Sequence, residues 1–331
     1  MLEHGGRLHL AASQYGIPVP EWLDLSTGIN PNGWPVPQLP ARVWQRLPEE
    51  DDELIPAARQ YYRNESLLAV AGSQAAIQTL PLLRSHSRVG VLHPAYAEHA
   101  EGWRRAGHSV SVVDEADIDT QLEQLDVLII INPNNPTGRL WPRKRLMNWH
   151  RKLNEKGGWL IVDEAFIDVI DDDYSLSALP VRPGLIVLRS IGKFFGLAGI
   201  RCGFVIAEQN VLKTMQHRLG PWAISHPARH AAAMALQDKV WQQVALEQLR
   251  QQELRLQEVL AASGWESAGG CALFQWVKHE AAVQLHHRLA ERGIWTRLFT
   301  NPISVRFGLP ADESDWQRLE RELVGINKLL V

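Results

Sequence analysis

Lys193 is the residue whose surroundings most clearly suggest chemistry. It follows an apolar run over residues 185–188 and lies in the segment RSIGKFFGLAGIRCG, among glycines and apolar side chains. Burial of a charged amine is costly, so this setting favours the neutral amine, which is a nucleophile. The position predicts a lysine that forms a Schiff base, with a solvated surface lysine as the alternative.

A carboxylate follows a second apolar run. Asp163 comes directly after residues 159–162 and opens the segment DEAF. A buried ionised carboxylate requires a positive partner, which could be a metal ion or a protonated ring nitrogen. The GxxxxGK[ST] loop of nucleotide-binding proteins does not occur in the sequence, which argues against a nucleotide-bound metal. A simple capping role for Asp163 is the other alternative.

Two more strand ends carry polar groups suited to a phosphorylated ligand. After LLAVA come Gly72, Ser73 and Gln74, at the start of an expected helix whose N–H groups and dipole attract a phosphate. After VLIII comes NPNNPTG, whose prolines end the strand and whose asparagines could hold a phenolate or carbonyl oxygen without adding charge. Ordinary turns would explain either segment taken alone.

Together these segments match the needs of one cofactor. Pyridoxal phosphate (PLP) requires a lysine amine, a carboxylate at its ring nitrogen, a group at its phenolic oxygen and an anion site for its phosphate. A metal site is less well supported, because the 13 histidines form no HExxH pattern. We interpret the pair His286-His287 as part of a solvated helix face.

A sheet must position these residues. Short apolar runs bounded by Gly, Pro or Asp alternate with helix-length segments, and runs such as VLIII are apolar on both faces. We therefore expect an α/β fold with a mostly parallel seven-stranded sheet that binds its ligand at the carboxyl ends of the strands. The expected strands are 67–71, 89–92, 110–113, 127–131, 159–162, 185–188 and 203–207.

The remainder of the chain reads as a smaller α+β domain. A Pro-rich stretch, 29–40, marks one boundary, and a long amphipathic helix over 235–263 follows the large domain. The expected later elements are strands over 268–279 and 304–310 and helices over 280–292 and 312–330. The expected domains are an N-terminal segment (1–40) that contributes to the small domain and substrate site, a large cofactor domain (41–234), and a linking helix with the small domain (235–331).

Composition narrows the class of protein. The 331 residues carry 34 basic and 37 acidic side chains, a net charge of −3, so neither a nucleic-acid partner nor disorder is indicated. No apolar run approaches a membrane span, and the N-terminus lacks a secretory signal, so we expect a cytoplasmic protein without a membrane partner. Cys202 and Cys271 are expected to be buried and unpaired.

The motifs NPNNPTG and VDEAF, and Ser190-x-x-Lys193 followed by Arg201, resemble fold-type I PLP-dependent enzymes of the aminotransferase superfamily. The resemblance implies a Schiff base at Lys193, with Asp163 at the pyridine nitrogen and Asn135 at the phenolic oxygen. It also implies that Tyr96 stacks on the ring. The implied phosphate-binding residues are Ser73, Gln74, Ser190 and Arg201.

Within the superfamily the chain is similar to histidinol-phosphate aminotransferases and, in its opening segment, to threonine-phosphate decarboxylases of cobalamin biosynthesis. Two departures from the aminotransferase pattern are Phe166, where a tyrosine is usual, and Leu47, which replaces the tyrosine of an RYP motif that reaches a neighbouring subunit. Phe166 favours the decarboxylases. The substrate-binding residues implied by the resemblance, or placed near the substrate from the N-terminal segment, are Arg297, Arg306, Asn30, Gly28, His4 and Arg7.

The predicted activity is decarboxylation of L-threonine O-3-phosphate to (R)-1-amino-2-propanol O-2-phosphate, in a homodimer. An aminotransferase acting on histidinol phosphate or a similar phosphorylated amine is the alternative. A catalytically silent binding protein on the same fold is a third hypothesis, which the complete set Asp163, Asn135, Lys193 and Arg201 disfavours.

Overall fold

The computed structural model describes residues 4–330 and divides the chain into two compact units. The large unit comprises Trp34–Asn135 and Leu140–Gln242, and the small unit comprises the chain up to Gly33, Pro136–Arg139 and the chain from Gln243 onward. The chain therefore crosses between the units more than once.

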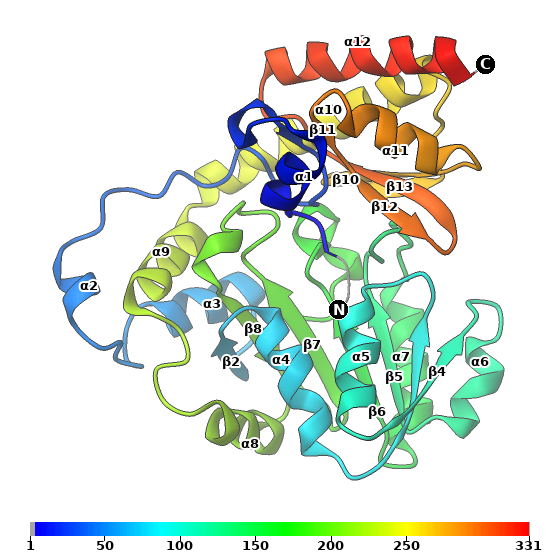
Figure 1. The fold of residues 1–331 in the computed structure, drawn as a ribbon. Helices are drawn as coiled ribbons and strands as arrows, with labels where there is room; N and C mark the ends of the chain where they lie inside the picture. Colours follow the sequence, from blue (N-terminus) through cyan, green and yellow to red (C-terminus); the bar gives the residue numbers. More distant parts are fainter. Residues whose placement is uncertain (1–3, 331) are drawn as a thin grey trace. The chain divides into compact units, whose positions relative to one another are not determined.

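The large unit is built on a seven-stranded sheet of order β2-β8-β7-β6-β5-β3-β4 (Figure 1). The strands β4, β3, β5, β6 and β7 are parallel to one another, and β8 is antiparallel to both β7 and β2. The predicted mostly parallel sheet is thus confirmed. Its strands are β2 (Leu67–Val70), β3 (Arg88–Leu92), β4 (Ser109–Val113), β5 (Val127–Ile131), β6 (Trp159–Asp163), β7 (Leu185–Ser190) and β8 (Gly203–Ile206).

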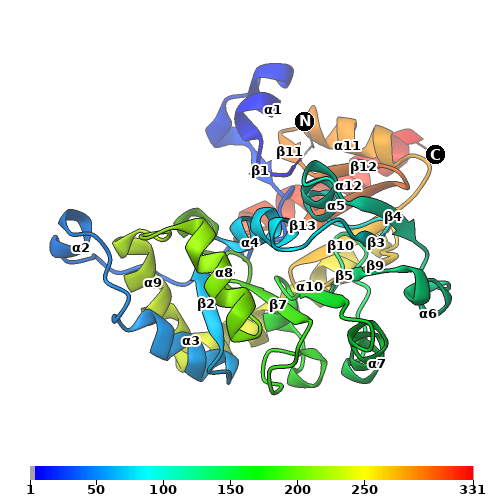
Figure 2. The same ribbon diagram turned by 90° about the horizontal axis from the view of Figure 1, so that it is seen from below.

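Helices cover both faces of this sheet. On one face, α4 (Ser73–Thr79), α5 (Ala97–Arg105) and α8 (Gln209–Leu219) pack on a core of apolar strand residues such as Ile129 and Leu188. Figure 2 shows α5 and α7 (Arg143–Asn154) on opposite sides of the strands. The other helices of the large unit are α2 (Arg42–Gln45), α3 (Leu54–Tyr62), α6 (Ile118–Gln121) and α9 (His226–Gln237), with short 3-10 turns that include η4 (Ile167–Val169) and η5 (Asp172–Tyr174).

The small unit contains a four-stranded antiparallel sheet of order β12-β13-β10-β9 and a parallel pair, β1 with β11. Helix α11 packs on β12 and β13, and α12 packs on α11. The elements are α1 (Leu8–Tyr15), η1 (Val19–Glu21), β1 (Leu23–Asp24), β9 (Gly269–Cys271), β10 (Phe274–Lys278), α11 (Ala282–Ala290), β11 (Ile294–Trp295), β12 (Arg297–Thr300), β13 (Ile303–Gly308) and α12 (Glu313–Leu330).

Two predicted elements of the C-terminal part were wrong in detail. The segment 268–279 is a hairpin of two strands, not one strand, and β12 was missed because its run Arg297–Thr300 is short. The single helix over 235–263 is interrupted at Asp238, where α9 ends and α10 (Lys239–Ala262) begins. The Asp238 carboxylate caps α10 by accepting a hydrogen bond from the Trp241 N–H at 3.0 Å, and it also accepts one from the Trp34 indole N–H at 3.0 Å.

The interpretation of His286-His287 as a solvated helix face was also wrong. His286 is 5% exposed, and its Nδ1 lies 2.8 Å from Thr296 Oγ1. His287 is exposed, but its Nδ1 lies 2.8 Å from the hydroxyl of Tyr15 in α1. The pair therefore ties α11 to a strand on one side and to the N-terminal helix on the other. Burial, and then the nearby charges of His287 and Arg297, lower the pKa of His286 to about 4.

We expect the stability of the small unit to fall as the pH drops below the ordinary histidine pKa of 6.5 toward 4. In that window the unfolded chain binds a proton at His286 that the folded chain does not, so acid favours unfolding by up to about 3 kcal/mol. Urea unfolding at pH 7 and pH 4.5 measures the difference. The variant His286→Leu should lose much of this pH dependence, and an unchanged dependence would contradict the assignment.

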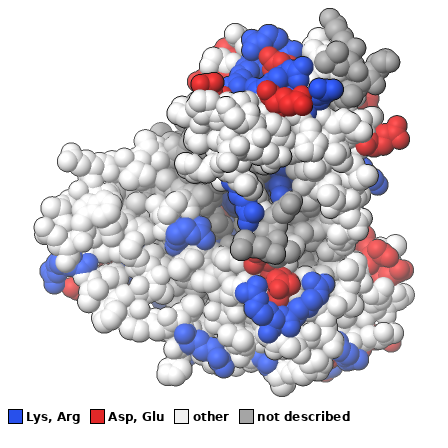
Figure 3. Space-filling view, in the orientation of Figure 1, with Lys and Arg blue, Asp and Glu red and all other residues white. Residues whose placement is uncertain are grey.

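Cys202 and Cys271 are buried and unpaired, as predicted, and burial raises the pKa of each thiol to about 12. No helix within residues 4–330 has both the length and the apolar character needed to cross a bilayer. On the face shown in Figure 3, the visible charged side chains occur in small groups, several of mixed sign.

Candidate active site

The predicted cofactor residues all belong to the large unit, and the sheet topology explains why they meet. The parallel strands β3, β5, β6 and β7 present their carboxyl ends at one edge of the sheet. Because β8 runs in the opposite direction, its amino end lies at that same edge, next to the carboxyl end of β2. In the register, Gly203 pairs with both Val70 and Ser190, so Ser73, Ser190 and Arg201 approach one another.

Asp163 is the buried acid of the site. Its side chain is 5% exposed, and its Oδ2 lies 2.8 Å from Nε2 of His99, which is buried in α5. Its Oδ1 accepts a hydrogen bond from the Ala165 N–H at 3.0 Å. A buried carboxylate can hold a protonated ring nitrogen through a charge-assisted hydrogen bond. This environment fits the pyridine nitrogen of PLP.

Tyr96 and Gln74 contact each other beside this acid. The Tyr96 hydroxyl donates to Gln74 Oε1 at 3.2 Å, and the Tyr96 ring meets His99 edge-on, with centroids 6.3 Å apart. Burial, followed by the charges of Glu98 and Asp163, raises the pKa of Tyr96 to about 12. The Gln74 amide also donates to Glu98 at 2.8 Å. A phosphate contact from Gln74 would therefore come from its backbone N–H.

Two glycines allow the anion-binding groups to come close together. Gly72 has a φ of +73°, and a Cβ on it would lie 2.6 Å from Nη2 of Arg201. A Cβ on Gly203 would lie 2.8 Å from the backbone nitrogen of Ser73. Only glycine permits these approaches, and they bring a guanidinium and backbone N–H groups to one place. The Ser190 hydroxyl accepts a hydrogen bond from the Gly192 N–H at 3.2 Å and adds a hydroxyl at the same strand end.

Lys193 lies on a loop that is anchored by aromatic residues. Its Nζ is 5.4 Å from the ring centroid of Phe166, the position where a tyrosine is usual in the resembled aminotransferases. The next residues, Phe194 and Phe195, are buried, and the Trp34 N–H donates to the Phe195 carbonyl at 2.9 Å. Because the backbone next to Lys193 is fixed, the positions that the Lys193 amine can reach are restricted.

The three asparagines of NPNNPTG have different environments. Asn132 and Asn134 are buried, and they hold the loop by bonds to the Trp141 backbone and to the Pro94 carbonyl. Asn135 is half-buried. Of the three asparagines, only Asn135 has the partial exposure that a ligand contact requires.

All six predicted substrate residues belong to the small unit. Arg297 and Arg306 face each other across β12 and β13 as register partners. Arg306 is 6% exposed, and its Nη2 donates to the Ser26 carbonyl at 2.7 Å. Burial, and then the charge of Arg297, lower the pKa of Arg306 to about 10. Two opposed guanidinium groups repel each other, and a bound anion would relieve that repulsion.

The other four substrate residues are close to the chain's start. Gly28 and Asn30 are buried, and Asn30 accepts a hydrogen bond from the Asn32 N–H at 3.0 Å. His4 and Arg7 are half-buried, and the Arg7 carbonyl caps the first turn of α1. Asn30 therefore shapes its own loop, whereas His4 and Arg7 keep partly exposed side chains.

A family model described as aminotransferase class I and II matches residues 42–319. The chain belongs to that family. It is 52% identical over 328 residues to a threonine-phosphate decarboxylase from Pseudomonas aeruginosa, covering 99% of each chain. It is 39% identical to a threonine-phosphate decarboxylase from a Sinorhizobium species, covering 96% of each chain. The fold matches that of histidinol-phosphate aminotransferase from Sinorhizobium meliloti, solved in complex with PLP, with a TM-score of 0.85. The two chains are 19% identical, and the match covers 100% of this chain and 99% of the other.

The family assignment confirms the resemblance predicted from the motifs. His99, the buried partner of Asp163, was not among the predicted site residues. Its signal was available in the segment HPAYAEH, since Tyr96 and His99 are three residues apart and share one face of the helix that follows. Within residues 4–330, no three His, Cys, Asp or Glu side chains gather as a metal site.

Proposed function

We propose that this protein catalyses the PLP-dependent decarboxylation of L-threonine O-3-phosphate, giving (R)-1-amino-2-propanol O-2-phosphate and CO2. The observation that carries the proposal is the full-length similarity to threonine-phosphate decarboxylases, at 52% and 39% identity. The opposed pair Arg297 and Arg306 supports an anionic substrate. The product is a phosphorylated aminopropanol. The resemblance implies that it supplies the aminopropanol part of cobalamin.

The residues of the large unit would divide the work of holding PLP. Lys193 would bind it covalently, Asp163 would hold the proton on its ring nitrogen, and Asn135 would contact its phenolic oxygen. Tyr96 would stack on the ring. The phosphate would be held by Ser73, Gln74, Ser190 and Arg201. Bound PLP supplies an electron sink for the electron pair that a broken bond leaves on the substrate Cα.

Orientation of the substrate then decides the reaction. The bond that breaks is the one perpendicular to the cofactor ring, because only its electrons overlap the ring's π system. A decarboxylase must hold the carboxylate in that direction, and it therefore needs a second anchor on the substrate. Arg297 and Arg306 would provide it through charge-assisted hydrogen bonds to the phosphate or carboxylate. Gly28, Asn30, His4 and Arg7 would complete the substrate site, and Lys193 would return a proton to Cα.

The test compares two reactions of the PLP-loaded protein. One contains L-threonine O-3-phosphate and is followed by CO2 release, and the other contains histidinol phosphate with 2-oxoglutarate and is followed by glutamate. We expect stoichiometric CO2 and no glutamate. Glutamate without CO2 would replace the proposal by an aminotransferase. Silence in both reactions would reject the substrate, while PLP absorbance would still test the cofactor site.

We also propose that the protein acts as a homodimer, whose second copy covers an apolar surface of the large unit. Trp44 and Trp222 are 68% and 57% exposed, and Leu47 is 61% exposed. A cavity of about 830 Å³ is lined by residues that include Trp44 and Arg201. Large exposed aromatic side chains are typical of interfaces. The cytoplasmic location stays a prediction.

The substitution Trp44→Glu should weaken the dimer by at least about 10-fold, because it places a charge in an apolar contact. Light scattering across a dilution series measures the dissociation. The matched control is Leu254→Glu, which alters a similarly exposed residue, 60%, on α10. A monomeric wild-type protein, or equal effects of the two variants, would refute the placement of the interface.

A further inference from the structure

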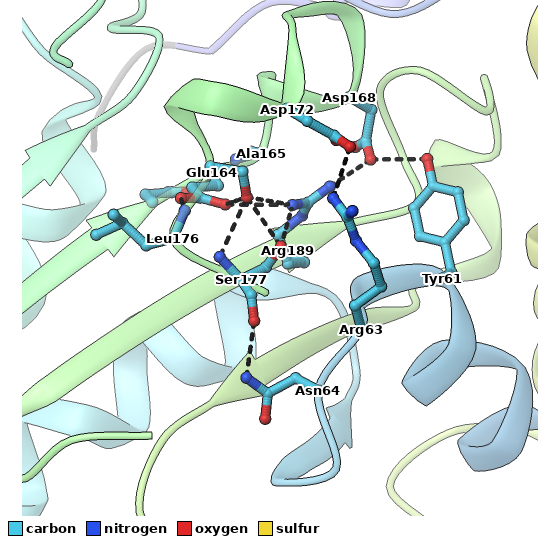
Figure 4. Close-up of polar contacts among 12 residues, drawn as sticks. Tyr61, Arg63, Asn64, Glu164, Ala165, Asp168, Asp172, Leu176, Ser177 and Arg189 are labelled. Atoms are coloured by element: carbon cyan, nitrogen blue, oxygen red, sulfur yellow. Dashed lines mark hydrogen bonds and ion pairs between the residues drawn. The ribbon is translucent and has the colours of Figure 1, made fainter. Parts of the chain in front are cut away.

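A buried ionic network centred on Arg189 lies behind the strand ends that carry the cofactor residues (Figure 4). Arg189 is 4% exposed, and its Nη1 lies 3.2 Å from Glu164 Oε2 and 3.1 Å from the hydroxyl of Ser177. Its Nη2 donates to Asp168 in η4. The guanidinium carbon is 4.6 Å from the ring centroid of Tyr62 in α3. One guanidinium therefore joins two carboxylates of the segment that follows β6.

The two carboxylates are held from their other sides as well. Glu164 is fully buried, and it accepts hydrogen bonds at 2.6 Å from the Ser175 hydroxyl and at 2.6 Å from the Leu176 N–H. Asp168 accepts a hydrogen bond from the Tyr61 hydroxyl at 2.9 Å. Burial alone would lower the pKa of Arg189, but Asp168 and Glu164 outweigh that effect and raise the pKa above its ordinary value. The pairing keeps the guanidinium charged.

The chain positions of these residues connect the network with the cofactor site. Successive side chains of a strand point to opposite faces, so Arg189 points away from the face that holds Ser190. Glu164 likewise points away from the face that holds Asp163. The Glu164 N–H donates to the Leu188 carbonyl at 2.9 Å, which extends the pairing of β6 with β7 by one residue. Arg189 and Glu164 are thus the direct chain neighbours of two predicted cofactor residues, Ser190 and Asp163.

A role in stability alone does not explain this arrangement. Buried ion pairs often stabilise a fold less than apolar residues of similar volume would. The surrounding sheet residues, such as Val187 and Leu188, are apolar and fully packed. The charges occur where the ends of β6 and β7 must hold Asp163 at a fixed distance from the loop of Lys193, four residues after Arg189.

We infer that Arg189 and Glu164 are positioning residues, which fix the acid at the cofactor ring nitrogen relative to the lysine and the serine of the next strand. This inference rests on the proposed PLP chemistry. Displacement of a reacting group by about 1 Å can cost about 100-fold in rate, so a rigid tie between these strand ends has a direct effect on turnover. The network itself does not touch the substrate or the cofactor.

The test uses Glu164→Gln and Arg189→Lys in the PLP-loaded protein. Gln keeps the size of the side chain but removes its charge, and Lys keeps the charge but cannot fork to two carboxylates. The matched control is Asp172→Asn, which neutralises an exposed acid that pairs with Arg63 at 2.6 Å at the edge of the same cluster. The readouts are kcat, KM, PLP content, the thermal midpoint, and the pH midpoint of the cofactor's visible absorbance without substrate.

We expect both variants to bind PLP with the same stoichiometry, to lower kcat about 30- to 100-fold, and to change KM less than about threefold. The pH midpoint of the absorbance should shift in both, whereas the control should match the wild type in every readout. A lower thermal midpoint with unchanged kcat per bound PLP and an unchanged absorbance midpoint would overturn the inference.

A substitute variant and a readout without substrate cover the two ways in which this test could fail to give an answer. If Arg189→Lys does not fold, Glu164→Gln and Tyr61→Phe, which removes only the hydroxyl donor to Asp168, carry the comparison. If the wild type releases no CO2 from L-threonine O-3-phosphate, the proposed function fails. The absorbance midpoint still decides whether the network positions the cofactor groups, because that readout needs no substrate.

Discussion

Replacement of Lys193 by alanine is expected to abolish CO2 release from L-threonine O-3-phosphate and to remove the visible absorbance of the bound cofactor. The loss should exceed about 10⁴-fold, the order found when a covalent catalyst is removed. Lys193 is held on a loop whose buried Phe194 and Phe195 fix its backbone, with Phe166 beside the amine. No neighbouring side chain on that loop can supply an amine.

Absorbance spectra and CO2 release of the purified variant, after dialysis against PLP, measure this effect. The matched control is Lys213→Ala, an exposed lysine on α8, which should behave as the wild type. Retention of both the absorbance and the turnover by Lys193→Ala would overturn the assignment of the cofactor lysine. The same result would remove the basis of the proposed reaction.

Replacement of Arg306 by alanine is expected to lower kcat/KM for the phosphorylated substrate by about 100-fold, which corresponds to the loss of about 3 kcal/mol of charge-assisted hydrogen bonding. Most of the loss should fall on KM, because the arginine binds an anion and does not move a proton. Arg306→Lys should recover only part of the loss, since an ammonium group cannot form two parallel hydrogen bonds.

Steady-state kinetics with L-threonine O-3-phosphate and with L-threonine separate the two roles of this arginine. If Arg306 binds the phosphate, the variants lose much more with the phosphorylated substrate than with L-threonine. Equal losses would assign Arg306 to the carboxylate, and no loss would exclude it from the substrate site. Arg288→Lys, at an exposed position of α11, is the control, and thermal unfolding checks that removing the donor to the Ser26 carbonyl leaves the fold intact.

The large sheet and the residues at its edge could be predicted from the amino-acid sequence. Runs such as VLIII are apolar at every position, and only a strand covered on both faces uses all of those side chains. A residue that follows such a run must lie at the strand's carboxyl end, so Asp163 and Lys193 could be selected without coordinates. The motifs then identified the family, which its model over residues 42–319 confirms.

The contact partners of these residues could not be predicted from the sequence and depend on the packing of the folded chain. His99 and Asp163 are 64 positions apart in the chain, and their contact depends on how α5 packs over β6. The environment of His286 also depends on packing. The adjacent pair of histidines suggested a solvated helix face, whereas His286 is buried and contacts Thr296. The pattern of residues along a helix predicts which face is exposed on average. It does not predict which distant segment of the chain packs on that face.

The interruption at Asp238 and the network around Arg189 show the physical reason for this division. The Asp238 carboxylate, at the break between α9 and α10, accepts a hydrogen bond from the Trp34 indole N–H, 204 positions earlier in the chain. Arg189 stays charged inside a sheet because two acids, 25 and 21 positions earlier in the chain, surround it. Hydrophobic periodicity is a property of adjacent residues and can be read from the sequence, whereas the pairing of buried polar groups depends on segments that only the folded chain brings together.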